Sequence, residues 1–136
     1  MFVLIQNKPA TEGEGPQVLI ERKEGVPELE ELQAAVGGWV DATTLADLGN
    51  GRVLTAWVND EGLLIGLPIL QILNPPAYRG PANLAGNVVL AITDMNTGET
   101  VPMTEEEAGL ISFGGRWLLN FLTGQMVPLL SYTGSN

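Results

Sequence analysis

Cysteine and histidine are both absent from this chain of 136 residues. Their absence excludes a disulfide framework, a cysteine nucleophile, a Ser-His-Asp triad and a zinc site built from the usual ligands. No spacing of the remaining polar residues matches a catalytic signature, so we expect no catalytic residue, no metal and no cofactor. An enzyme that uses Asp41 or Asp60 with a metal is the remaining catalytic alternative.

Basic residues are few: Lys and Arg number 6 against 16 Asp and Glu, which gives a net charge of -10. Such a chain repels nucleic-acid backbones and anionic membranes, so we expect no direct nucleic-acid binding. A small anionic ligand could bind only where several basic side chains converge. Those available are Lys8, Arg22, Lys23, Arg52, Arg79 and Arg116.

Long hydrophobic runs are also lacking. The longest, residues 62–73, is too short to span a bilayer and is interrupted by Pro68. The segment MFVLIQNKPA has no basic start and alternates like a strand, unlike a signal peptide. We therefore expect a soluble, cytoplasmic protein without membrane contact. Only 16% of residues are charged and 45% are apolar, which favours a homo-oligomer that covers part of the apolar surface.

The first two thirds of the chain read as strands around one helix. Its length fits a single domain, residues 1–136. Residues 28–36 have a helical apolar period, and Gly37-Gly38 ends it. The segment 52–60 has apolar residues on both faces, which predicts a central strand. The other expected strands are 1–6, 16–22, 39–48 and 87–94. The loop 7–15 and the loop 49–51 should each join two neighbouring strands into an antiparallel pair.

The last part of the chain predicts more helix. We expect a short helix or turn and then a long loop over residues 68–86. Thr104 and Glu107 form a capping box that predicts a helix over residues 105–113. Apolar residues recur at i, i+1, i+4 and i+5 from Trp117, which predicts an amphipathic helix in an extension over residues 109–130. The fold class expected is α+β: a small, mostly antiparallel sheet with two or three helices, one of them C-terminal.

Four blocks of sequence carry a family resemblance. They are LQAAVGGWVDA (residues 32–42), VNDEGLLIGLP (58–68), AGNVVLAI (85–92) and VPMTEEEA (101–108). In this order they resemble the family known as domain of unknown function 3846, over about residues 32–108. Members of that family look like short proteins of phages, plasmids and actinobacteria. The resemblance implies a phage or mobile-element context, hence the host cytoplasm, and brings no activity or cofactor with it.

The segment Asn59-Asp60-Glu61-Gly62 has two interpretations. As a turn, its Asn or Asp bonds the neighbouring backbone and Gly62 takes a positive φ. As a site, Asn59 and the following amides contact a ligand at the strand end. The turn is the favoured interpretation, with the ligand site as the alternative.

Arginines on glycine-rich loops are the other candidates. In Tyr78-Arg79-Gly80 the Arg could clamp a phosphate, the aromatic ring could stack on a base, and Gly allows close approach. Arg52 follows a glycine turn and Arg116 follows Gly114-Gly115. A solvated Arg beside a structural Tyr is the competing interpretation of the first group.

Two functions follow as hypotheses. The first is a non-catalytic phage or mobile-element protein that sequesters a small anionic ligand, such as a host nucleotide immune signal, as an anti-defence protein. The alternative is an acidic inhibitor of a host protein, either by direct interaction or by mimicry of nucleic acid.

Overall fold

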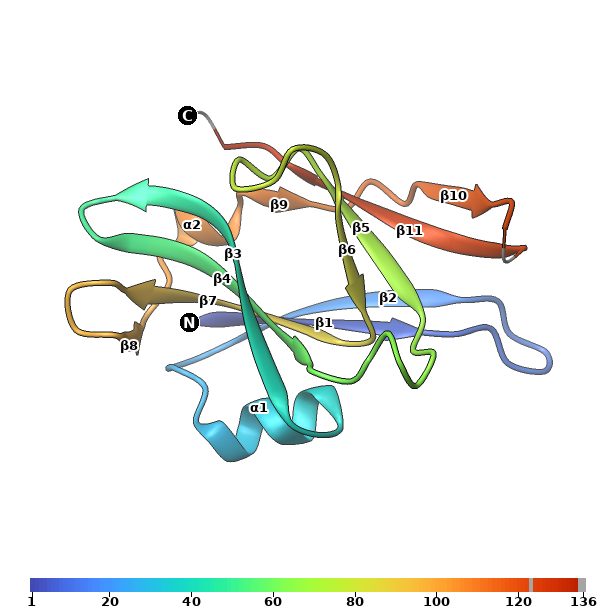
Figure 1. The fold of residues 1–136 in the computed structure, drawn as a ribbon, viewed down its shortest axis with the longest axis horizontal. Helices are drawn as coiled ribbons and strands as arrows, with labels where there is room; N and C mark the ends of the chain where they lie inside the picture. The colour runs from blue at the N-terminus through green and yellow to red at the C-terminus, as the bar shows by residue number, and fades with distance from the viewer. Residues whose placement is uncertain (123, 135–136) are drawn as a thin grey trace.

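The computed structural model describes residues 1–122 and 124–134. It contains two sheets and two helices (Figure 1). The first sheet consists of β1 (Phe2–Lys8), β2 (Gln17–Lys23), β3 (Val40–Gly49), β4 (Arg52–Asn59), β7 (Val88–Asp94) and β8 (Glu99–Val101). The second consists of β5 (Ile69–Leu73), β6 (Ala82–Ala85), β9 (Ile111–Ser112), β10 (Trp117–Asn120) and β11 (Gln125–Tyr132). The helices are α1 (Leu29–Val36) and α2 (Glu105–Ala108).

The first sheet is antiparallel and runs in the order β2-β1-β7-β4-β3, with β8 paired to β7. The second sheet runs β10-β11-β5-β6, with β9 paired to β11, and its β11–β5 pair is parallel. The prediction of a central strand over residues 52–60 is confirmed, because β4 lies between β7 and β3. Asn50 and Gly51 have positive φ at the β3–β4 turn, as an Asn-Gly hairpin turn requires.

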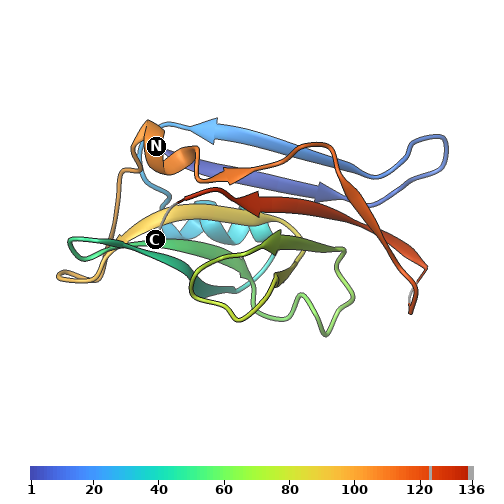
Figure 2. The ribbon, with the colours of Figure 1, turned by 90° about the horizontal axis from the view of Figure 1, so that it is seen from above.

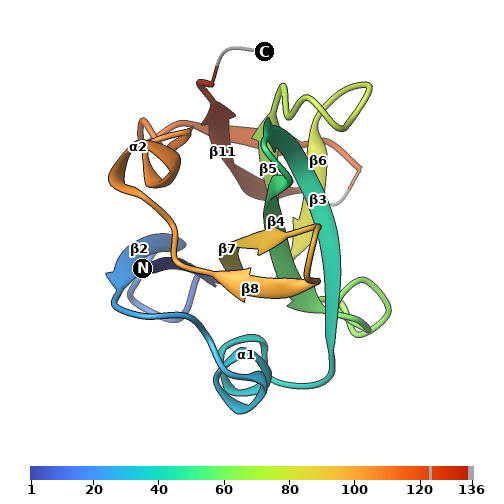
Figure 3. The ribbon, with the colours of Figure 1, turned by 90° about the vertical axis from the view of Figure 1, so that its left-hand side faces the viewer.

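Alternation along the strands divides the core into two layers. Ile5, Leu54 and Ile92 of the first sheet pack in one cluster with Ile72 and Leu130 of the second. Residues on the opposite face form a smaller cluster beneath α1, made of Phe2, Leu4, Leu32, Val89 and Ala91. Figure 3 shows α1 on the side of the first sheet that faces away from the second. Burial on both faces explains why the first four residues of β1 and the first five of β7 are all apolar.

The α+β prediction is wrong: 50% of the described residues are in strands and 9% in helices, which makes the fold mainly β. The first helix is confirmed over Leu29–Val36, and Gly37 caps it in the left-handed conformation. The Thr104 capping box is also confirmed, with bonds in both directions between Thr104 and Glu107. That helix ends at Ala108, however, because the chain then enters β9 at Ile111 and pairs with β11.

The predicted C-terminal helix is also wrong, since β10 and β11 form a hairpin there. Their apolar spacing fits either period, and a long-range partner decides the outcome: β11 pairs with β5, with Leu130 opposite Ile72. Pro128 is suited to this structure because its position opposite Trp117 needs no N–H, whereas a helix interior would lose a hydrogen bond there.

The prediction of a short helix or turn and then a long loop over residues 68–86 is wrong, because this segment contains two strands, β5 and β6. Leu70 and Ile72 are buried while Ile69 and Leu73 are half-buried, which is the period of a strand and not of a helix. The connection between these strands is therefore only residues 74–81. Among the described residues, no helix is long and apolar enough to cross a membrane.

Candidate functional site

The C-terminus of α1 is held by two asparagines, one at the end of β4 and one just before β7. The last carbonyls of a helix have no partner within the helix. Asn59 Nδ2 donates to the Val36 carbonyl at 3.1 Å, and Asn87 Nδ2 donates to the Ala35 carbonyl at 3.0 Å. The ends of β4 and the segment before β7 are thereby fixed to the helix.

A third asparagine extends this network to β1. The Asn7 N–H donates to Asn87 Oδ1 at 2.9 Å, and Asn7 Nδ2 donates to the Pro68 carbonyl at 3.0 Å. Asn59 Oδ1 accepts the Glu61 N–H at 2.9 Å. We call Asn7, Asn59 and Asn87 the asparagine cluster. Because Pro68 and Glu61 lie at opposite ends of one loop, the cluster fixes both ends of it.

Two glycines at the base of this loop are required by close packing. A Cβ on Gly62 would lie 3.0 Å from the Ala85 Cβ, and one on Gly86 would lie 2.7 Å from Leu67 Cδ1. Gly86 also has φ +80°, whereas Gly62 lacks the positive φ that the turn interpretation predicted. The loop therefore packs tightly against the segment before β7, where no side chain fits.

The loop presents large apolar side chains to solvent. Leu63, Leu64 and Ile65 are 71%, 87% and 58% exposed, and Trp39 is 71% exposed. The Asp60 N–H donates to the Trp39 carbonyl at 3.0 Å, so these residues lie at the same end of the β3–β4 pair. We call Trp39, Leu63, Leu64 and Ile65 the apolar loop patch. Neighbouring exposed apolar side chains on a rigid base are typical of interaction surfaces.

The charges near the patch are acidic. Asp60 and Glu61 are exposed at the start of the loop, and exposed Asp41 follows Trp39 closely in β3. Between Lys23 and Arg79 the sequence has a single basic residue, Arg52. The acidic residues of the sequence in the same interval are Glu24, Glu28, Glu30, Glu31, Asp41, Asp47, Asp60 and Glu61.

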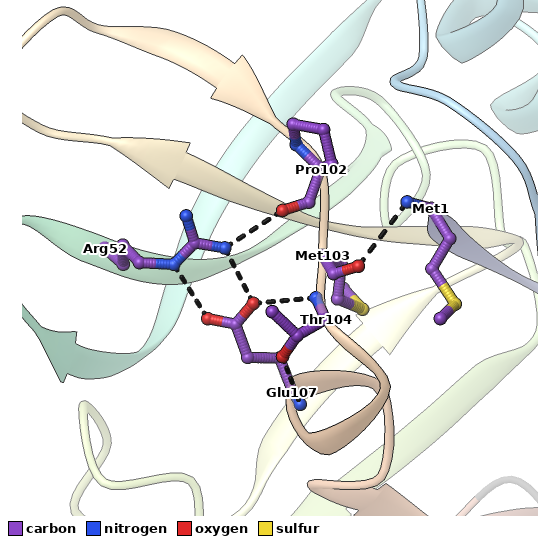
Figure 4. A network of polar contacts seen from close by, with 6 residues as sticks. All are labelled: Met1, Arg52, Pro102, Met103, Thr104 and Glu107. Atoms are coloured by element: carbon purple, nitrogen blue, oxygen red, sulfur yellow. Dashed lines mark hydrogen bonds and ion pairs between the residues drawn. The ribbon is translucent and has the colours of Figure 1, made fainter.

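Arg52 is bound to α2 and is not a free cation (Figure 4). Its Nε donates to Glu107 Oε2 at 2.9 Å and its Nη2 donates to Oε1 at 2.7 Å and to the Pro102 carbonyl at 2.9 Å. The hydrogen bond from Arg52 holds the pKa of Glu107 below its usual value, and the same bond raises the pKa of Arg52. Nearby, the Met103 N–H donates to the Met1 carbonyl at 2.9 Å. This network attaches α2 to the first sheet.

The other predicted arginines lie on different elements. Arg79 is exposed in the β5–β6 connection and forms no side-chain hydrogen bond or ion pair with the described residues. Tyr78 beside it bonds Thr43 on β3 through its hydroxyl, and Gly80 has φ 145°. Arg116 is exposed just before β10. The structure thus places Tyr78, Arg79 and Gly80 in one loop but does not bring Arg52 or Arg116 to it.

A cavity of about 500 Å³ lies between the end of β3 and α2, and its charged lining is acidic. Burial raises the pKa of the Tyr132 phenol beside it. No group of three or more Asp and Glu side chains within the described residues could hold a metal ion. The lining residues are Asp47, Leu48, Gly49, Thr104, Glu106, Glu107, Leu110 and Tyr132.

Comparison with known proteins identifies the family. The chain matches the family described as Domain of unknown function (DUF3846) over residues 9–114, and it belongs to that family. No curated protein and no solved structure matches the chain. The sequence blocks that carried the resemblance supply most of the asparagine cluster and the apolar loop patch. The β10–β11 hairpin lies beyond the matched residues.

Sequence reasoning identified Asn59 but not Asn7, Asn87 or the apolar loop patch. Asn59 is buried, and both its amide and its carbonyl oxygen are bonded within the protein. The available signal was Leu-Leu-Ile between Gly62 and Gly66, because consecutive apolar residues in a turn have no core to enter. The bonds of Asn7 and Asn87 depend on contacts far apart in sequence, which no local pattern indicates.

Proposed function

We propose that this protein is a non-catalytic interaction protein that docks the apolar loop patch into an apolar hollow with a basic rim on a partner protein. The observation that carries the proposal is the exposure of Leu63, Leu64 and Ile65 on a loop whose two ends are fixed by buried asparagines. Exposed apolar side chains in sequence are costly unless a partner covers them.

The rigidity of the loop base supports a docking role. Ordering a flexible loop on binding costs about 0.5–1.5 kcal/mol for each immobilised side chain. Here the base is ordered beforehand by the bonds of Asn59 and by the tight packing of Gly86 against Leu67. A large aromatic such as Trp39 is a residue type that often supplies binding energy at the centre of interfaces.

The surrounding charge defines the chemistry of the partner. Asp60, Glu61 and Asp41 would face Lys or Arg side chains at the rim of the partner's hollow. Such complementary charges speed association and exclude acidic competitors, and their effect falls as salt increases. The proposal therefore takes the acidic-inhibitor form of the sequence hypotheses, with a host protein as the partner if the chain acts in a phage or mobile-element context.

The positions of the arginines favour this function over sequestration of a small anion. An anion site needs several cations aimed at one point. Arg52 is neutralised by Glu107, while Arg79 and Arg116 lie before different strands. Sequestration at the Tyr78-Arg79-Gly80 loop remains a separate hypothesis with its own test.

Photo-crosslinking at two positions tests the proposed function. A photoreactive residue replaces Leu64 in one variant and Met95, which is 63% exposed in the β7–β8 turn, in the matched control. We expect the Leu64 position to crosslink one host protein, the Met95 position not to, and the adduct to decrease with added salt. The proposal would be contradicted if neither position formed an adduct or if both formed it equally. It would also be contradicted if the Leu64 position crosslinked only a second copy of this chain.

A further inference from the structure

The β10–β11 hairpin carries a second exposed apolar surface, outside the residues that match the family. Phe121 is 89% exposed and Leu122 is 98% exposed at its turn. On its strands, Leu119 and Met126 lie opposite each other on one face and Leu118 lies on the other face, and all three are between 40% and 49% exposed. We call these five residues the hairpin patch. Figures 1 and 2 show this hairpin at the same end of the molecule as the β1–β2 hairpin.

The hairpin differs from the apolar loop patch in charge. The sequence has no Asp, Glu, Lys or Arg after Arg116. The whole chain has a net charge of -10, so two copies repel each other across most of their surfaces. A partner with a basic rim would find no acid to pair with on this hairpin. The surface is best suited to another apolar surface without acids, and a second copy of this hairpin provides one.

The backbone of β10 is available for pairing. β10 is the edge strand of its sheet. The Leu129 N–H donates to the Arg116 carbonyl at 2.9 Å, so alternation places the next bonded position at Leu118. Trp117 and Leu119 therefore direct their backbone N–H and C=O groups away from β11. β10 contains none of the lysines or prolines that usually protect an exposed edge from pairing.

We propose that two copies of the chain associate through β10, which pairs antiparallel with β10 of the second copy across a two-fold axis. The same residues then serve both sides of the interface, as in any two-fold dimer. The pairing satisfies the outward groups of Trp117 and Leu119 and places the hairpin patch of each copy beside that of the other. This interface is independent of the apolar loop patch, which stays free for another partner.

Sedimentation equilibrium of the full chain over a range of concentrations, with two variants, tests this dimer. Leu122→Asp places a carboxylate from each copy among the apolar side chains of the interface, where burying a charge is costly, so we expect a monomer. Leu119→Pro removes an N–H that points away from β11 and leaves the hairpin bonds intact, so we expect a monomer here too. Leu64→Asp is the matched control, because it makes the same kind of change in the other apolar surface and should remain a dimer.

Far-UV circular dichroism shows whether each variant keeps its strands. A dimeric wild type, monomeric and folded Leu122→Asp, and dimeric Leu64→Asp are the expected results. In the wild type, we also expect the backbone amides of Trp117 and Leu119 to become more protected from hydrogen exchange as the protein concentration rises. This measurement needs no variant. A wild type that is monomeric at every concentration, or a dimer that persists in Leu122→Asp with both amides unprotected, would overturn the proposal.

Discussion

The Asn59 carboxamide donates a hydrogen bond to the Val36 carbonyl, 3.1 Å away at the C-terminus of α1, and accepts one from the Glu61 N–H. One buried side chain thus joins the end of a helix to the start of the exposed loop. In this account the asparagine cluster maintains the shape of the loop, and the apolar loop patch contacts the partner.

Asn59→Ala should destabilise the protein by about 1–3 kcal/mol, because it leaves the Val36 carbonyl and the Glu61 N–H unpaired. The free energy of unfolding is measured by urea denaturation, and limited proteolysis reports the loop. Asn83→Ala is the control, since Asn83 is exposed on β6. Equal stability of the two variants would show that the bonds of Asn59 are not structural.

Gly86→Ala should destabilise the protein more than Gly98→Ala does. Both glycines have φ near +80°, so in both variants an alanine in the left-handed conformation costs about 1–2 kcal/mol of stability. A Cβ added at position 86 would also lie only 2.7 Å from Leu67 Cδ1, whereas a Cβ added at position 98 would have no neighbour within 4 Å. The extra cost should be about 1–3 kcal/mol, as in an overpacked core. Leu67→Ala added to Gly86→Ala should recover part of it in thermal unfolding.

Glu107→Gln should cost about 1–2 kcal/mol at pH 7, because it weakens the charge-assisted bonds with Arg52. The folded pKa of Glu107 is lowered, so its contribution is complete above the unfolded value of about 4.3 and is lost as pH falls toward the folded value. The stability difference between wild type and variant should be constant near neutral pH and shrink below pH ~4.3. Exposed Glu106→Gln is the control, and a difference that does not change with pH would contradict the role of the charge.

Arg79→Ala tests the anionic-ligand hypothesis directly. Native mass spectrometry compares the wild type and this variant after incubation with linear and cyclic nucleotides. The docking account predicts that neither retains a nucleotide. Retention by the wild type that is lost in Arg79→Ala would instead establish a ligand site at Tyr78-Arg79-Gly80, with Arg116→Ala as the control on a different element.

Local sequence patterns predicted the elements that local interactions determine. The Asn50-Gly51 turn, α1 and the Thr104 capping box each depend on residues only a few positions apart, and all three are observed. The C-terminal residues and β5 depend instead on each other, because β11 pairs with β5 across more than 50 positions. Their apolar spacing fitted a helix as well as a strand, and only the distant partner distinguishes the two.

The same limit applies to the candidate site. Asn59 was recognised within a turn, but its bond to Val36 spans 23 positions and that of Asn7 to Asn87 spans 80. Arg52 was predicted as a candidate ligand contact because Glu107, 55 positions away, was not foreseen as its partner. Residue type can be read locally, whereas whether a charge is free or paired depends on the folded chain.

The central claim is tested most directly by the affinity of the crosslinked partner, once purified, for three forms of the protein. Isothermal titration compares the wild type with Leu64→Ser and with Met95→Ser, the exposed control. The account predicts that Leu64→Ser weakens binding at least about tenfold, or ~1.4 kcal/mol, while Met95→Ser binds as the wild type does. Equal affinity of all three forms would contradict docking through the apolar loop patch.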